Sequence, residues 1–125
     1  MTPLVFLALS AAGGVGAALR LFTDGVVRSR MKIAYPLGTT IINVAGSFIL
    51  GLITGAALSH VVAESWHLVI GTGLMGGFTT FSTASFETVR LLQERRWVAA
   101  LMNGFGMLVL AVLAALAGLA IGGAL

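Results

Sequence analysis

Three polar side chains recur at every fourth position of an otherwise apolar stretch: Thr39, Asn43 and Ser47. Side chains four residues apart lie on one face of a helix, so we expect these three to share a face. Hydroxyl and amide groups can donate hydrogen bonds without carrying a charge. The spacing therefore predicts a polar, uncharged stripe on an apolar helix.

A second candidate site is the run Gly-Gly-Phe-Thr-Thr-Phe-Ser-Thr at residues 76–83. Two glycines followed so closely by two β-branched threonines make a poor helix interior. Backbone groups freed by a break inside a membrane must be satisfied by protein, water or ions, and interrupted helices at the midplane are known to build ion sites. A packing kink against a glycine-rich neighbour is the alternative. The hydroxyl groups crowded around the run favour an ion site.

Membrane-spanning helices must position these residues, because a mean hydropathy of +1.07 and 9% charged residues are incompatible with a soluble surface. A spanning helix needs about 20 mostly apolar residues. The stretches without Asp, Glu, Lys or Arg are residues 1–19, 33–63, 65–86 and 97–125. We therefore predict one all-α integral membrane domain over residues 1–125, with four transmembrane helices and the third broken near the bilayer midplane.

The first span is predicted over residues 4–19, and Asp24-Gly25 is predicted to begin a polar connection that ends at Tyr35-Pro36. Met1-Thr2-Pro3 provides no basic n-region, which favours a span over a signal peptide. The chain has no cysteine, which excludes disulfides and thiolate metal sites.

All seven Lys and Arg residues lie in two clusters, within residues 20–32 and 90–96. With four spans, both clusters fall on the same side of the membrane. Positively charged loops stay in the cytoplasm, so both termini are predicted outside a bacterial-type plasma membrane. The basic balance of the chain comes from its few acids, and it does not predict nucleic-acid binding.

The run at residues 76–83, with Asn43 in the second span and Arg20 ending the first, resembles the Fluc (CrcB) family of fluoride channels. The resemblance covers the whole chain. It implies an antiparallel dimer with two narrow fluoride pathways that export fluoride passively and lower its cytoplasmic concentration. It also implies a structural sodium ion, not transported, held at the dimer centre by the backbone carbonyls of Gly76 and Thr79. Carbonyl oxygens suit such a hard cation.

The resemblance also implies roles for individual side chains in the fluoride pathway. Fluoride is small and tightly hydrated, so a dry pathway must replace its water with convergent donors, and a phenylalanine presents a positive ring edge to an anion. Arg20 matches a vestibule arginine and Glu87 a glutamate just after the motif. Asn103 is expected either to link helices by a hydrogen bond or to form part of the pathway wall. The other matched pathway positions are Thr39, Asn43, Phe81, Ser82 and Thr83.

Two departures from the family pattern bear on the partner. Ala84 stands where a second pore phenylalanine is usual, and after Asn103 the last span carries Met107 and Ala111 in place of a Tyr/Ser track. An antiparallel homodimer also requires each chain to insert both ways, which the one-sided charge opposes. The expected partner is a paralogue of opposite orientation that completes the pathway, with a homodimer as the alternative.

Three other functions fit the sequence less well. Small multidrug-type proton-coupled exporters carry a glutamate in the first span, but residues 1–19 of this chain contain no acid. A non-transporting subunit explains the glycines but not the polar stripe. An enzyme is disfavoured, because four acids and two histidines in a loop assemble no triad, dyad or metal cluster.

Overall fold

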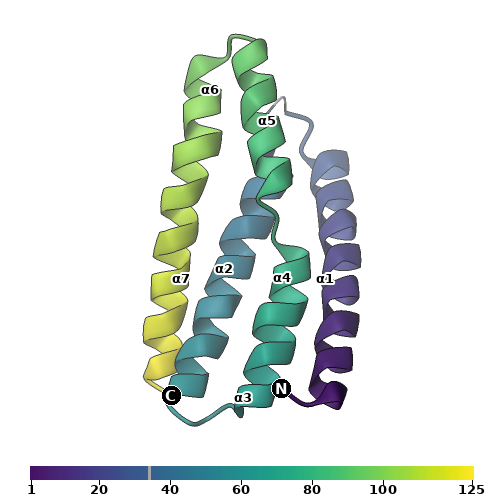
Figure 1. The fold of residues 1–125 in the computed structure, drawn as a ribbon. Helices are drawn as coiled ribbons and strands as arrows, with labels where there is room; N and C mark the ends of the chain where they lie inside the picture. The colour runs from purple at the N-terminus through teal and green to yellow at the C-terminus, as the bar shows by residue number, and fades with distance from the viewer. Residues whose placement is uncertain (34) are drawn as a thin grey trace.

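The computed structural model describes residues 1–33 and 35–125; Ala34, within the predicted connection between the first two spans, lies outside the described residues. Over this part of the chain the regular structure is entirely helical. Three helices in it are long and apolar enough to cross a membrane: α1 (Pro3–Arg30), α2 (Leu37–Leu58) and the continuous helix Trp97–Gly123. Figure 1 shows these helices side by side, with both termini at the same end.

The region predicted as the third span consists of shorter segments. They are α3 (Glu64–Trp66), the π-helix η1 (His67–Met75), α4 (Gly76–Phe78) and α5 (Ser82–Gln93). The last helix contains α6 (Trp97–Leu101), the π-helix η2 (Met102–Gly106) and α7 (Met107–Gly123).

The prediction of a polar connection from Asp24-Gly25 was wrong, because α1 continues to Arg30. Thr2 caps its first turn by accepting a hydrogen bond from the Val5 amide at 3.2 Å. Beyond the apolar stretch, Asp24 and Arg28 form an ion pair of 3.1 Å at the i, i+4 spacing that supports a helix. The helix is therefore longer than its membrane-spanning part.

Glycines allow the helices to pack in two close pairs. Helix α2 packs against α7, where a Cβ atom at Gly51 would overlap the carbonyl oxygen of Ala115. Helix α1 packs against η1 and α4, where a Cβ atom at Gly77 would overlap the carbonyl oxygen of Gly13. Small residues permit such approach between membrane helices, whose association gains little from burying apolar surface.

Candidate functional site

The helical structure is interrupted between Phe78 and Ser82. Thr79 is extended, with φ −79° and ψ 159°, and both its amide and its hydroxyl donate to the Met75 carbonyl at 2.9 Å. The Thr80 hydroxyl oxygen accepts from the Thr83 amide at 3.2 Å, which satisfies a free donor in the first turn of α5. The threonine side chains therefore close both ends of the interruption.

Asn43 of α2 binds the peptide groups of Thr80 through both ends of its amide. Its Oδ1 accepts from the Thr80 amide at 2.8 Å, and its Nδ2 donates to the Thr80 carbonyl at 2.8 Å. The same Nδ2 donates to the sulfur of Met107 at 3.2 Å. Asn43 thus makes to Thr80 the pair of hydrogen bonds that a neighbouring β-strand would make, and both its amide hydrogens are engaged within the chain.

The carbonyl groups before the interruption lose their usual helical partners. In an uninterrupted helix the Thr80 amide would bond to the Gly76 carbonyl, but here it bonds to Asn43. Gly76 is exposed, with no atom within 4 Å of the position that a Cβ would take. The next carbonyl, of Gly77, accepts from Arg20 Nε at 3.4 Å. No group of three or more His, Cys, Asp or Glu side chains suited to a metal is found in residues 1–33 and 35–125.

A groove of about 540 Å³ opens beside the interruption, between α2, α5 and the last helix. Phe81 lines it and is 87% exposed, so its ring extends away from its own chain. The described residues that line the groove include no charged side chain. Its polar lining residues are Asn43, Ser47, Thr79, Thr80, Ser85, Thr88 and Asn103.

Asn103 links η2 to α5 on the wall of this groove. Its Nδ2 donates to Thr88 Oγ1 at 2.9 Å and to the Ala84 carbonyl at 3.3 Å. Thr88 uses its one hydroxyl hydrogen on the Ala84 carbonyl at 2.8 Å, so it can only accept from Asn103, and this fixes the orientation of the amide. The Asn103 Oδ1 is buried without a partner among the described residues.

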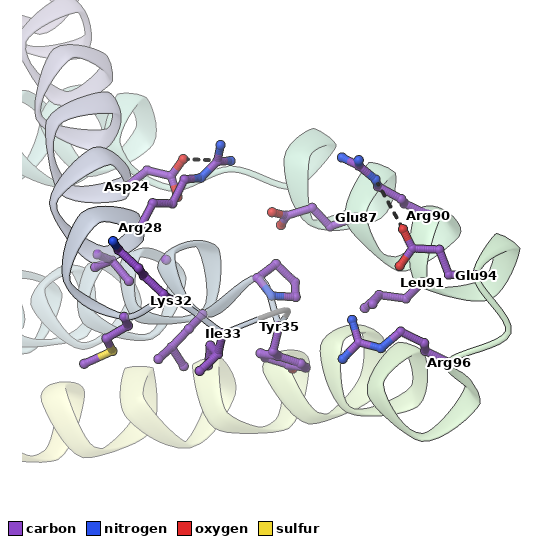
Figure 2. Close-up of a pocket in the computed structure, with 15 residues that line it drawn as sticks. Asp24, Arg28, Lys32, Ile33, Tyr35, Glu87, Arg90, Leu91, Glu94 and Arg96 are labelled. Carbon is purple, nitrogen blue, oxygen red and sulfur yellow. Dashed lines mark ion pairs between the residues drawn. The ribbon is translucent and has the colours of Figure 1, made fainter.

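A second cavity, of about 460 Å³, lies where the charged residues gather (Figure 2). Glu87 lines this cavity rather than the groove, and its carboxylate points toward the Asp24–Arg28 pair. Thr39 of α2 is buried and lies near the Glu87 carboxylate. Arg90 and Glu94 form an ion pair of 3.6 Å at the edge of the same cavity.

The structure thus distributes the predicted site residues over several places. Asn43, Phe81 and Asn103 line the groove, whereas Ser82 and Thr83 begin α5 outside its lining. The predictions did not include Ser85 or Thr88. Their spacing of four and seven residues from Phe81 is a sequence signal, but it identifies them only once the helical segment is known to run on from Phe81.

Comparison with known proteins places the chain among relatives that match it over nearly its full length. The sequence profile of the family described as CrcB-like protein, Camphor Resistance (CrcB), matches residues 7–119. The chain is 58% identical over 123 residues to "Fluoride-specific ion channel FluC 1" of Leifsonia xyli, covering 98% of this chain and 90% of the relative. It is 47% identical over 112 residues to "Fluoride-specific ion channel FluC 2" of Cutibacterium acnes, covering 89% and 91%. It is 39% identical over 100 residues to "Fluoride-specific ion channel FluC 3" of Bifidobacterium longum, covering 80% and 83%.

Proposed function

The chain belongs to the CrcB family, and from that premise we propose that it is a multi-pass membrane protein that conducts fluoride passively out of the cell. The observation that carries the proposal is the uncharged polar groove beside the helix interruption, in a chain 58% identical to a protein named as a fluoride-specific channel. A groove that offers hydroxyls and an aromatic edge suits a small anion. Export lowers the cytoplasmic fluoride concentration.

The proposed arrangement has four spans and two chains. Residues 64–93 form the remaining span, with the interruption at 79–81 near the bilayer midplane. An antiparallel dimer accounts for a groove that is open on one side and for a phenylalanine ring that is 87% exposed beside it. The partner's surface would close the groove and complete the pathway.

A structural sodium ion is part of the proposal. The Gly76 carbonyl, released from its helical bond, and the Thr79 carbonyl at the extended residue would hold it. Such oxygen ligands fit a hard cation, and the ion would provide a partner for carbonyl groups that face a second chain rather than water.

The partner is proposed to be a paralogue of opposite orientation. All seven Lys and Arg residues lie in the two clusters on one side of the four spans, and relatives carry the numbers FluC 1, FluC 2 and FluC 3. Reporter fusions to the C-terminus test this, and we expect nearly all chains to place it outside. Comparable populations facing both ways would leave a homodimer as the better account.

Fluoride efflux from liposomes tests the function itself. The purified chain is reconstituted alone and with its paralogue, and efflux is followed with a fluoride electrode beside a chloride control. Fluoride flux without chloride flux is expected in at least one of the two preparations. Equal permeability to both anions, or none from well-folded protein in either preparation, would overturn the proposal.

A further inference from the structure

We propose that the hydroxyls of Ser47 and Ser85 are the side-chain donors that bind the anion along the groove, whereas Asn43 positions the helix interruption. This inference rests on the proposed function of the groove as a fluoride pathway. Most hydrogens of the polar lining residues are already used in bonds within the chain.

The three threonine hydroxyls of the groove are engaged. Thr79 donates to the Met75 carbonyl at 2.9 Å, and Thr80 donates to Thr83 Oγ1 at 3.1 Å. Thr88 donates to the Ala84 carbonyl at 2.8 Å. A hydroxyl has one hydrogen, so none of these can bind an anion without first breaking a bond to its own chain.

The two asparagine amides are engaged as well. Asn43 gives its hydrogens to the Thr80 carbonyl and the Met107 sulfur, and Asn103 gives its hydrogens to Thr88 and the Ala84 carbonyl. What Asn103 leaves unpaired is an acceptor oxygen, which would repel an anion brought against it. Asn43 is therefore a positioning residue for the extended segment.

Ser47 and Ser85 remain. Among the described polar residues that line the groove, only these two hydroxyls donate to no group in the chain. Ser85 is exposed, and Ser47 is part-buried. Both can turn toward an anion without giving up a bond.

The two serines lie on opposite sides of the interruption. The Asn43–Thr80 bonds place Asn43 level with the extended segment. Ser47 lies one helical turn, about 6 Å, beyond Asn43, and Ser85 lies one turn beyond Phe81. Helices α2 and α5 run in opposite directions (Figure 1), so the two serines diverge from that level. An anion would meet one hydroxyl on each side of the phenylalanine ring.

Alanine and threonine substitutions at these two positions test the inference. Fluoride flux is measured in whichever preparation conducts, the chain alone or with its paralogue. Loss of a hydrogen bond to the charged ion weakens its binding, so Ser47→Ala and Ser85→Ala should each lower fluoride flux at least about tenfold. Ser47→Thr and Ser85→Thr restore a hydroxyl and should recover most of it. The control is Ser10→Ala, which removes a hydroxyl from the exposed face of α1 and should leave flux unchanged.

Stability separates the donor role from a structural one. Because neither serine hydroxyl bonds to the chain, both alanine variants should unfold at the same detergent concentration as the unaltered protein. Unchanged flux in both alanine variants of a conducting protein would overturn the inference and leave the proposed function standing. No fluoride flux in any preparation of the unaltered protein would overturn both.

Discussion

Replacement of Asn43 by leucine should destabilise the protein through the backbone of Thr80. Leucine branches at the same carbon as asparagine but neither donates nor accepts a hydrogen bond. The Thr80 amide and carbonyl would each lose a bond of 2.8 Å, and the Met107 sulfur would lose its donor. The extended segment cannot recover these bonds within a helix, because Thr79 turns the chain out of helical geometry.

The expected loss in the free energy of unfolding lies between two bounds. Two interhelical bonds at the membrane average of about 0.6 kcal/mol each give a lower bound of about 1 kcal/mol. An amide and a carbonyl both left unpaired cost about 1–3 kcal/mol each, which gives an upper bound of about 6 kcal/mol. Both groups are part-buried beside an open groove, so some rehydration is available. We expect a loss of about 2–3 kcal/mol in the free energy of unfolding.

The measurement is reversible unfolding in mixed micelles, followed by the fluorescence of Trp66 and Trp97. Ser47→Ala is the matched control, one turn along the same helix with no hydrogen bond to lose, and it should change the stability by less than about 0.5 kcal/mol. A stability of Asn43→Leu within that same margin would show that the Asn43–Thr80 bonds do not hold the interruption.

Two further predictions concern packing and polarity. Gly77→Ala would bring a methyl group onto the Gly13 carbonyl oxygen and should lower the free energy of unfolding by about 1–3 kcal/mol. Gly76→Ala places its methyl group in open space and should cost less than about 1 kcal/mol. Equal melting temperatures of the two variants would contradict the close packing of α1 on α4. Asn103→Asp places an acceptor against the Ala84 carbonyl and Thr88, and should destabilise the protein by at least about 3 kcal/mol. Asn103→Leu also removes the unpaired Oδ1 and should cost less. The reverse order of stability in micelle unfolding would contradict this orientation of the Asn103 amide.

The helical class followed from local composition. Long apolar stretches carry that information in the sequence itself. The end of α1 did not follow, because hydropathy measures what the membrane accepts and says little about where helical geometry stops. The helix continues to Arg30, well past the predicted end of the span at residue 19, and the Asp24–Arg28 ion pair supports it there.

Ser85 of α5 was missed for a different reason. Ser82 and Thr83 were predicted because they stand beside Phe81 in the motif. The extended residue Thr79 resets the helical phase, so which residues of α5 face the groove depends on the backbone angles of the interruption. A sequence pattern gives the spacing within a helix but not the rotation between two helical segments.

The distribution of donors along the groove also bears on the proposed dimer. A conduction site must bind strongly enough to admit an ion and weakly enough to release it. This wall of the groove uses most of its polar hydrogens to satisfy its own interrupted backbone, and it leaves two serine hydroxyls about one turn to either side of the phenylalanine. Two single donors cannot replace the whole hydration shell of a fluoride ion. In the proposed dimer the remaining donors would come from the partner surface that closes the groove, and the partner's residues would then contribute to selectivity as well as to assembly.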